Sequence, residues 1–172
     1  MNEVIKSILT RRSTRDFNDE LVKKSDIEMI LKTAIYAPSG QNRQTGKYIA
    51  IMNQDLILEL AKIIEEVLER KAYNFYKAKV LILTTNQKES IWGRDDCACA
   101  MQNMMLAAHS LDIGSVWINQ VYQSCENPKM RALLDKIGVP SDYIVYGVCA
   151  LGYSDSTPLG IISKKENISI IE

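Results

Sequence analysis

The chain has 172 residues, of which 47% are hydrophobic and 24% charged, with eight Gly and four Pro. These proportions are typical of one globular domain with a sizeable core, so we expect a single domain over residues 1–172 and no extensive disorder. Lys plus Arg and Asp plus Glu both number 21, and this balance argues against nucleic acid as the partner.

The N-terminal residues, Met-Asn-Glu-Val-Ile-Lys, lack the basic start and the apolar run of a signal peptide. No later stretch approaches the roughly 18 uncharged apolar residues of a membrane span. We therefore expect a cytoplasmic protein with no role for a membrane.

A short amphipathic stretch ends in a cluster of cationic and hydroxyl side chains, which are Arg11, Arg12, Ser13 and Arg15. Each guanidinium offers a planar fork of donors that matches a phosphate edge, so the cluster predicts a phosphorylated ligand. The alternative is a solvated helix end whose arginines pair with carboxylates such as Asp16 and Asp19.

The next segments predict a helix, a loop, a strand and a second helix. Ser25 and Glu28 have the spacing of a capping box, and an apolar stripe follows them until Pro38 begins a loop. The apolar run at 48–52 suits a strand. Asn53 can then cap a helix that keeps one face apolar to about Lys71.

The second half of the chain continues to alternate between extended and helical patterns. We expect strands at 79–85, 115–121 and 143–151, a helix at 95–111, and a helix that starts at Asn127-Pro128 and runs through Lys136. The tail from 152 to 172 is polar and ends in an Ile-Ser-Ile-Ile run with no local partner, which indicates an arm that packs on a neighbouring chain. Periodicity by itself suggests a doubly wound parallel sheet.

The cysteines and the single histidine do not indicate a metal or a catalytic dyad. Cys97, Cys99, Cys125 and Cys149 form no paired Cys-x-x-Cys arrangement, and buried free thiols are the simpler interpretation. His109 lies within a helical pattern, where a packed or cap-adjacent histidine is more common than a catalytic one. We therefore expect no metal ion and no catalytic side chain.

Five segments together resemble the nitroreductase family of FMN-dependent oxidoreductases. They are Arg-Arg-Ser-Thr-Arg-Asp-Phe at 11–17, Ala-Pro-Ser-Gly-Gln-Asn-Arg-Gln at 37–44, Gln-Asn-Met-Met-Leu-Ala-Ala-His-Ser-Leu at 102–111, Gly-Ser-Val-Trp-Ile-Asn at 114–119 and Leu-Gly-Tyr at 151–153. Any one of them is weak, whereas their order and spacing together are specific.

The resemblance implies an α+β fold with a central, mostly antiparallel sheet flanked by helices, and we rank this fold above the parallel sheet. It also implies an intertwined homodimer with FMN at the subunit interface. In that arrangement residues 153–172 form a C-terminal arm that packs on the partner subunit.

The resemblance also implies roles for particular residues. The cluster Arg11, Arg12, Ser13 and Arg15 would hold the flavin phosphate and ribityl chain. Pro38, Ser39 and Gly40 would lie against the isoalloxazine of the partner subunit's flavin, with amides from Asn42 or Gln44 at its polar atoms; a plain β-turn is the alternative for 38–40.

Two later segments complete the implied site. The strand end at Trp117, Ile118 and Asn119 would approach flavin N5, with the Asn119 amide N–H as donor, although Trp117 could equally be a core aromatic. A basic residue of the tail, Lys164 or Lys165, would reach the phosphate unless these lysines are merely solvated.

The sequence departs from the family's usual pattern in three places. Thr45-Gly46 stand where many relatives have Pro-Trp. The connection at 87–94 is short, so the groove is open, with an apolar wall from Trp92 or from the aromatic group Tyr73, Phe75 and Tyr76. In the tail, Ser154 stands where Pro often follows Gly-Tyr, and Gly160 lies near the place of an expected basic residue, which argues against a phosphate contact from the tail.

The resemblance implies a ping-pong oxidoreductase that passes electrons from NADH or NADPH through FMN to nitroaromatics, quinones or other electron-poor acceptors. A flavin-binding carrier, sensor or redox partner with little turnover is the alternative, and a specialised FMN-dependent dehydrogenation is a third possibility. The preferred coenzyme and the physiological acceptor are not fixed by these residues.

Overall fold

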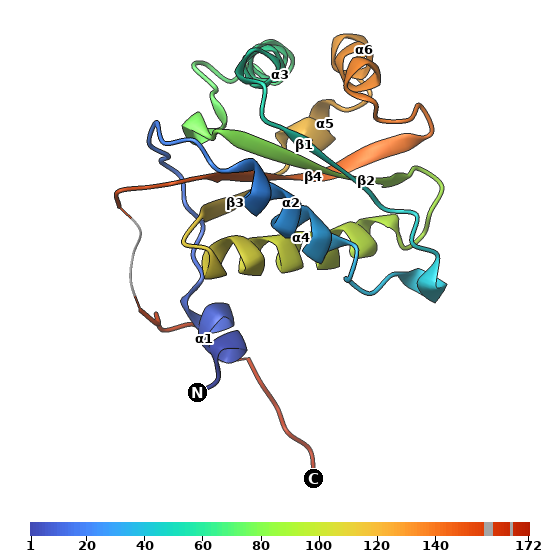
Figure 1. Ribbon diagram of the computed structural model, residues 1–172. Helices are drawn as coiled ribbons and strands as arrows, with labels where there is room; N and C mark the ends of the chain where they lie inside the picture. The colour runs from blue at the N-terminus through green and yellow to red at the C-terminus, as the bar shows by residue number, and fades with distance from the viewer. Residues whose placement is uncertain (157–159, 166) are drawn as a thin grey trace.

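The computed structural model describes residues 1–156, 160–165 and 167–172. Within them, four strands form one antiparallel sheet in the order β1-β2-β4-β3 (Figure 1). The strands are β1 (Lys47–Ile51), β2 (Val80–Gln87), β3 (Gly114–Ile118) and β4 (Tyr143–Gly152). The antiparallel pairing confirms the α+β fold and rules out the doubly wound parallel sheet.

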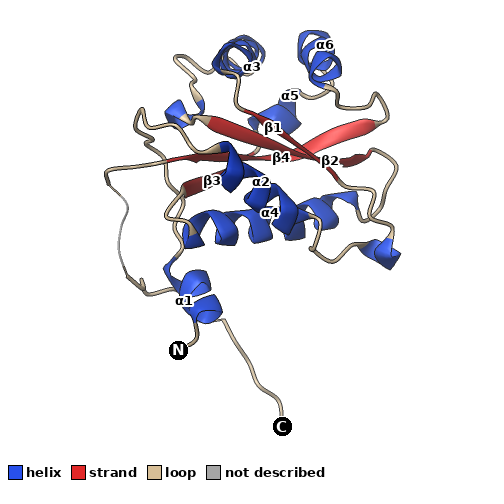
Figure 2. Cartoon of the chain, viewed as in Figure 1, coloured by secondary structure: helices blue, strands red, loops and turns tan. Residues whose placement is uncertain are grey.

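Helices cover both faces of this sheet (Figure 2). They are α1 (Glu3–Thr10), α2 (Lys24–Ala34), α3 (Gln54–Val67), α4 (Gly93–Ser110), α5 (Gln120–Ser124) and α6 (Pro128–Ile137). One apolar cluster joins the sheet to α3, α5 and α6, and a second joins it to α2 and α4. None of the helices in the described ranges is long and apolar enough to cross a membrane.

The burial of both faces explains the unbroken apolar run of β2. Leu81 and Leu83 point into the cluster beneath α3, whereas Val80 and Ile82 point into the cluster beneath α4. Side chains alternate between the two faces of a strand, so a strand covered on both sides can be apolar at successive positions, as β2 is from Val80 to Leu83. This central strand therefore ties the two clusters together.

Two of the three predicted helix caps are confirmed. The Asn53 side chain accepts a hydrogen bond from Leu56 N at 3.1 Å, and Asn127 accepts one from Lys129 N at 2.9 Å. The capping box at Ser25 is wrong, because α2 begins at Lys24 and its N-cap residue makes no side-chain cap. Ser25 thus lies inside the helix, two residues past the N-cap position Lys23, where its hydroxyl cannot cap the free amides.

Two other boundaries and one burial prediction differ from expectation. Helix α3 ends at Val67, short of Lys71, and Glu69 takes a positive φ of 52° that cannot continue the helix. Strand β3 ends at Ile118, and the residues after Asn119 form α5 in place of more strand. Cys99 is exposed, whereas the other three cysteines are buried free thiols.

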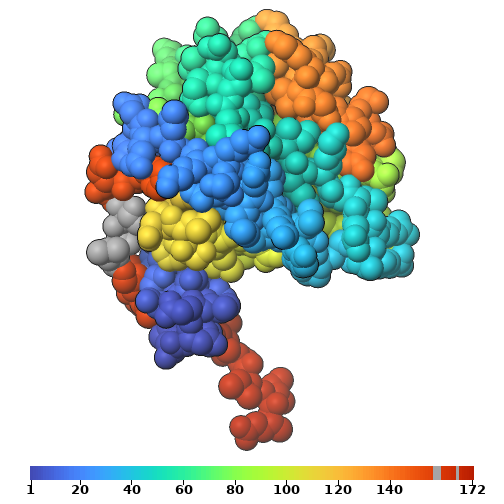
Figure 3. Space-filling model, viewed as in Figure 1, coloured from blue at the N-terminus to red at the C-terminus, as the bar shows by residue number. Residues whose placement is uncertain are grey.

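Helix α1 and the C-terminal segment project from the body of the molecule, as the space-filling view shows (Figure 3). Helix α1 has no buried residue, and its side chains Val4, Ile5, Ile8 and Leu9 are all exposed. Ile168, Ile170 and Ile171 of the tail are more than 80% exposed. Both segments therefore present apolar surface that this single chain does not cover.

Candidate functional site

The arginine cluster lies beside strand β3. Ser13 forms a parallel bridge with Ser115, and Thr14 N donates to the Ser115 carbonyl at 2.9 Å. A Cβ at Gly114 would lie only 2.8 Å from Thr14 Oγ1, so glycine allows this close approach. Residues 11–15 are thereby fixed along the start of β3, near the C-terminal end of α4.

Arg11 is half-buried and lacks a partner for part of its guanidinium. Its Nη1 atom is buried and makes no hydrogen bond within the described residues. Burial lowers the pKa of Arg11, and burial raises the pKa of Cys149 to about 12, partly opposed by the charge of Arg11. A buried cationic donor without an acceptor is costly, so this position is suited to an anion.

Arg12 uses most of its guanidinium within the chain. Nη1 donates to the carbonyls of Leu9 at 2.9 Å and Arg11 at 2.8 Å, and Nη2 donates to Gly160 O at 2.7 Å. Only its Nε is buried and unpaired within the described ranges. Arg12 therefore connects the end of α1 to the start of the tail, and its buried Nε–H is left without an acceptor among the described residues.

The structure does not pair the arginine cluster with the nearby carboxylates. Asp16 lies 3.7 Å from Lys77 Nζ, and Asp19 lies 2.7 Å from Lys79 Nζ. Arg15 is exposed and Ser13 is half-buried. The alternative of a helix end neutralised by Asp16 and Asp19 is therefore not supported, because lysines occupy these carboxylates.

His109 connects α4 to α1 at the same end of the site. Its Nε2 lies 2.8 Å from Thr10 Oγ1, and the Thr10 hydroxyl donates to Lys6 O at 2.8 Å. The hydroxyl proton is thus engaged, so His109 Nε2 is the donor to Thr10. The ring also lines a hollow of about 710 Å³ between α1, the end of α4 and the tail.

Burial and the charges of Arg11 and Arg12 lower the pKa of His109 below its ordinary value of 6.5. As the pH falls, the imidazole of His109 is therefore protonated at a higher pH in the unfolded chain than in the folded chain. Protonation of His109 thus lowers the free energy of unfolding as the pH falls below 6.5. We expect Arg11→Ala to raise the pKa of His109, measured from the ring protons of the single histidine by NMR titration of tag-free protein.

The control for this titration is Lys62→Ala, an exposed change on α3 at the opposite face of the sheet. It should leave the His109 pKa where it is. An unchanged His109 pKa in Arg11→Ala would show that the guanidinium does not act on the ring.

The loop from Pro38 to Gln44 lies at the other end of α4. Gln44 Nε2 donates to Asn42 Oδ1 at 2.8 Å, and Gln44 N donates to Ser39 Oγ at 3.2 Å. Asn42 and Gln44 thus hold each other, and both take positive φ angles near 50°. Positive φ angles are uncommon in residues other than glycine, and they occur more often at binding sites than elsewhere.

A pocket of about 220 Å³ opens beside this loop. Its lining includes Pro38, Ser39, Gln44, Tyr48 and Asp96. Burial, together with Cys97 and Asp96, raises the pKa of Tyr48 to about 12, so its hydroxyl stays protonated at neutral pH. The pocket therefore offers a neutral hydroxyl and a carboxylate beside the backbone of the loop.

The segment at the end of β3 is divided between the two faces of the sheet. Ile118 is buried in the cluster under α3, whereas Trp117 packs against the cluster under α4. A Cβ at Gly147 would lie 2.7 Å from Trp117 Nε1, and that Nε1 donates to Asn119 Oδ1 at 2.8 Å. Trp117 therefore behaves as a core aromatic that also holds the Asn119 side chain.

The remaining predicted side chains have distinct environments. Lys164 and Lys165 are exposed and make no hydrogen bond or ion pair within the described residues. Trp92 lies directly against Gly40 of the loop. Phe75 is fully buried on the α3 side of the sheet, and the Tyr73 ring lies edge-on to it with 4.9 Å between the ring centres. Of the two proposed aromatic walls, Trp92 is therefore the one that contacts the loop.

The arginine cluster and the loop thus form two groups of predicted residues at opposite ends of α4 (Figure 1). Gly40 contacts Asp96 near the start of the helix, and Thr10 contacts His109 near its end. These helix positions are 13 residues apart, which is roughly 20 Å along the axis at about 1.5 Å per residue. The arginine cluster and the loop of one chain are therefore separate places.

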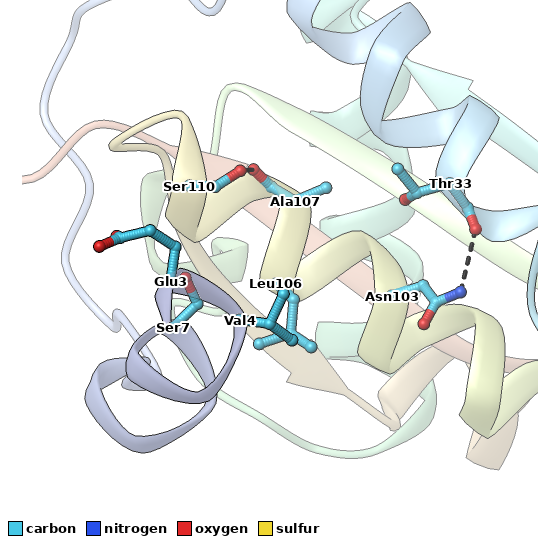
Figure 4. Close-up of a pocket in the computed structure, with 8 residues that line it drawn as sticks. All are labelled: Glu3, Val4, Ser7, Thr33, Asn103, Leu106, Ala107 and Ser110. Carbon is cyan, nitrogen blue, oxygen red and sulfur yellow. Dashed lines mark hydrogen bonds between the residues drawn. The ribbon is translucent and has the colours of Figure 1, made fainter. Parts of the chain in front are cut away.

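A third hollow, of about 420 Å³, lies between α1, α2 and α4 (Figure 4). Val4 and Leu106 point into it from two helices, and Asn103 Nδ2 closes one side by donating to Thr33 O at 3.1 Å. Its mainly apolar lining, next to the exposed face of α1, suits another apolar surface better than a charged ligand.

Sequence reasoning missed Asp96, Tyr48 and the link between His109 and Thr10. Asp96 stands next to Asp95 at the start of a helix, where acidic residues are common, so nothing in the pattern separates the buried carboxylate from the exposed one. Tyr48 lies in an apolar strand pattern. Gly40 and Asp96 are 56 residues apart in the sequence, so their contact leaves no signal in the local sequence pattern.

Residues 8–153 match the model of the nitroreductase family. The chain is 33% identical over 162 residues to an Archaeoglobus fulgidus protein named "Putative NADH dehydrogenase/NAD(P)H nitroreductase", with 89% of this chain and 86% of that protein covered.

Two solved structures are similar over their whole length. A nitroreductase from Bacteroides fragilis with bound FMN has a TM-score of 0.95 and 35% identity, and covers 100% of both chains. A nitroreductase from Desulfitobacterium hafniense, also with bound FMN, has a TM-score of 0.88 and 26% identity over 100% of both chains.

Proposed function

Because the chain belongs to the nitroreductase family and is an FMN-dependent NAD(P)H oxidoreductase, we propose that it reduces small electron-poor acceptors, such as nitroaromatics and quinones, in ping-pong order. FMN, when bound, supplies the redox chemistry, which is hydride transfer from NADH or NADPH and electron transfer to the acceptor. The observation that carries the proposal is the buried, unpaired Nη1 of Arg11 beside β3.

The residues at this position fit the phosphate of FMN. Arg11 Nη1 and Arg12 Nε are both buried donors with no acceptor among the described residues. A dianion accepts several charge-assisted hydrogen bonds and would remove both deficits. We infer that Arg11 is the main phosphate ligand, that Ser13 and Arg15 complete the cradle, and that Arg12 contributes only its Nε.

The loop and the end of β3 have a positioning role in this proposal. Pro38, Ser39 and Gly40 form one wall of the ring site, with the Asn42 and Gln44 amides at its rim. Trp117 and Ile118 hold the strand end in the core, so that the backbone N–H of Asn119 is presented as a fixed donor near N5. Fixed donors and orientation lower the barrier without a side-chain acid or base.

A homodimer would bring the two groups of residues together. They are roughly 20 Å apart along α4 in one chain, so we infer that the loop of each subunit meets the arginine cluster of its partner. The exposed apolar side chains of α1, the hollow of Figure 4 and the tail isoleucines supply surface for such an interface.

The C-terminal residues have a part in the same arrangement. We infer that residues 153–172 form an arm on the partner subunit, with Lys164 or Lys165 near a phosphate. Residues 157–159 and 166 lie outside the described residues. The exposed state of both lysines leaves them available for that role.

Steady-state kinetics with NADH or NADPH, varied against menadione or a nitrofuran, test the proposed reaction. We expect parallel lines in double-reciprocal plots, because the coenzyme leaves before the acceptor binds in the same groove. Purified FMN-loaded protein that turns over with neither coenzyme would contradict the proposal and would favour a carrier or sensor. Intersecting lines would contradict the ping-pong order alone.

A further inference from the structure

Gly40 of the loop is held from two sides by the first turn of α4. Its backbone N–H donates to Asp96 Oδ1 at 2.8 Å. A Cβ at Gly40 would lie 2.4 Å from Cγ of Trp92, so the indole packs directly on the glycine. Trp92 and Asp96 are one helical turn apart and are themselves joined, because Asp96 N donates to Trp92 O at 2.9 Å.

Asp96 is a buried carboxylate, only 7% exposed, and it lines the pocket beside the loop. A buried charge is unfavourable unless hydrogen bonds and nearby dipoles stabilise it. The Gly40 N–H and the N-terminal end of α4 supply that stabilisation. The same interaction makes the bond to Gly40 charge-assisted and therefore strong for a backbone amide.

The loop needs such support because its backbone is strained. Gln41, Asn42 and Gln44 have φ angles of 53°, 54° and 52°. Residues other than glycine keep such angles only where the surroundings enforce them. Thr45, at the far end of the loop, is held by Asn86 and Tyr143, since its Oγ1 donates to Asn86 Oδ1 at 2.8 Å and its carbonyl accepts from Tyr143 Oη at 3.0 Å.

The near end of the loop depends on Asp96 and Trp92. Arg43 adds a further contact, with its Cζ 4.8 Å from the centre of the Trp92 ring. The indole thus lies behind the loop, with Gly40 on it and the Arg43 guanidinium over its face. Loss of the side chain of Asp96 or of Trp92, the N-cap residue of α4, would free the segment from Gly40 to Arg43 while leaving Thr45 anchored.

We propose that Asp96 and Trp92 form a clamp that positions residues 38–44 as the wall of the flavin site. The role of the clamp in flavin binding rests on the proposed function, whereas its contacts with Gly40 do not depend on any ligand. Asp96 is then a positioning residue, which acts on the ring site through the backbone of Gly40. The charge of Asp96 strengthens the bond to Gly40, and an acceptor oxygen without the charge still keeps the contact.

The experiment compares Asp96→Ala with Asp96→Asn, and uses Asp95→Ala as a matched control at the exposed neighbouring position. The FMN dissociation constant comes from fluorescence titration of apoprotein, and visible circular dichroism reports the surroundings of the bound ring. We expect Asp96→Ala to raise the dissociation constant at least about 10-fold and to change the dichroism spectrum. Asp96→Asn should restore both, and Asp95→Ala should change neither.

A ligand-free readout separates this clamp from the proposed function. In protein labelled with 15N-glycine and free of FMN, we expect the Gly40 amide to exchange with solvent at least about 10-fold faster in Asp96→Ala. Unchanged exchange would overturn the clamp whatever the protein binds. Wild-type protein that binds no FMN, yet shows the faster Gly40 exchange in the variant, would overturn the proposed function and leave the grip on Gly40 established.

Gly40→Ala provides a second route if Asp96→Ala does not fold. The added methyl must displace the Trp92 ring, and the change lies at a half-buried loop position outside both core clusters. We expect the same loss of FMN affinity and the same change in dichroism. FMN binding and dichroism like those of the wild type in Gly40→Ala would overturn the part assigned to Trp92.

Discussion

Arg11→Ala should weaken FMN binding by roughly 10- to 150-fold, which corresponds to about 1.5–3 kcal/mol for a hydrogen bond to a charged group. The half-buried guanidinium has a donor with no partner among the described residues, so no other described residue replaces its interaction with a phosphate. Fluorescence titration of apoprotein with FMN measures the change. The double variant Arg11→Ala with Arg15→Ala should lose still more affinity.

The stability of the apoprotein distinguishes a ligand contact from a structural one. Removal of an unsatisfied buried donor relieves a cost, so Arg11→Ala should melt no lower than wild type without FMN, while the rise in melting temperature on adding FMN shrinks. Lys62→Ala, on the opposite helical layer, should change neither quantity. Unchanged FMN affinity in Arg11→Ala would remove this residue from the site.

Mixed dimers test whether each site combines two chains. If Arg11 and the loop of different subunits share a site, a dimer of one Arg11→Ala chain and one Asp96→Ala chain has one intact site and one doubly defective site. Random pairing of equal amounts should then recover about a quarter of the tight sites. No recovery would show that both groups serve a site within one chain.

Leu83→Ala should lower the free energy of unfolding by about 2–5 kcal/mol, because it opens a cavity under a fully buried side chain. Leu83 lies on the central strand β2 and faces the cluster under α3, away from the arginine cluster. Urea denaturation with an unchanged slope measures the loss. The folded fraction should keep its FMN stoichiometry.

The matched control is Leu58→Ala on the outer side of α3, where the side chain is 54% exposed. This change should stay within about 0.5 kcal/mol of wild type. A loss of less than about 1 kcal/mol in Leu83→Ala would contradict a sheet that is tightly packed on its α3 face.

Local signals predicted the elements better than they predicted the sheet. Asn53 and Asn127 cap helices as expected, because a side-chain oxygen and the next amides are adjacent in sequence. The predicted strand at 115–121 is too long at its C-terminal end, because α5 has only five residues and is too short to show a helical period. Strand pairing is non-local, so only the resemblance to a family indicated the antiparallel order.

Within the site, residue types could be predicted and their partners could not. Arg11 and Arg12 are adjacent in the same motif and each has one buried nitrogen without a partner among the described residues, yet only Arg12 also donates to three backbone carbonyls. The missing aromatic after Gln44 was visible in the sequence. That Trp92 packs on Gly40 depends on how α4 meets the loop, which no local pattern encodes.

The absorbance spectrum of the purified protein tests the central claim most directly, with any released flavin identified by chromatography after heating. We predict one FMN per chain and bleaching of the flavin band on addition of NADH or NADPH without oxygen. A colourless protein that also fails to take up added FMN would contradict the account, because the unpaired donor of Arg11 would then serve no flavin phosphate.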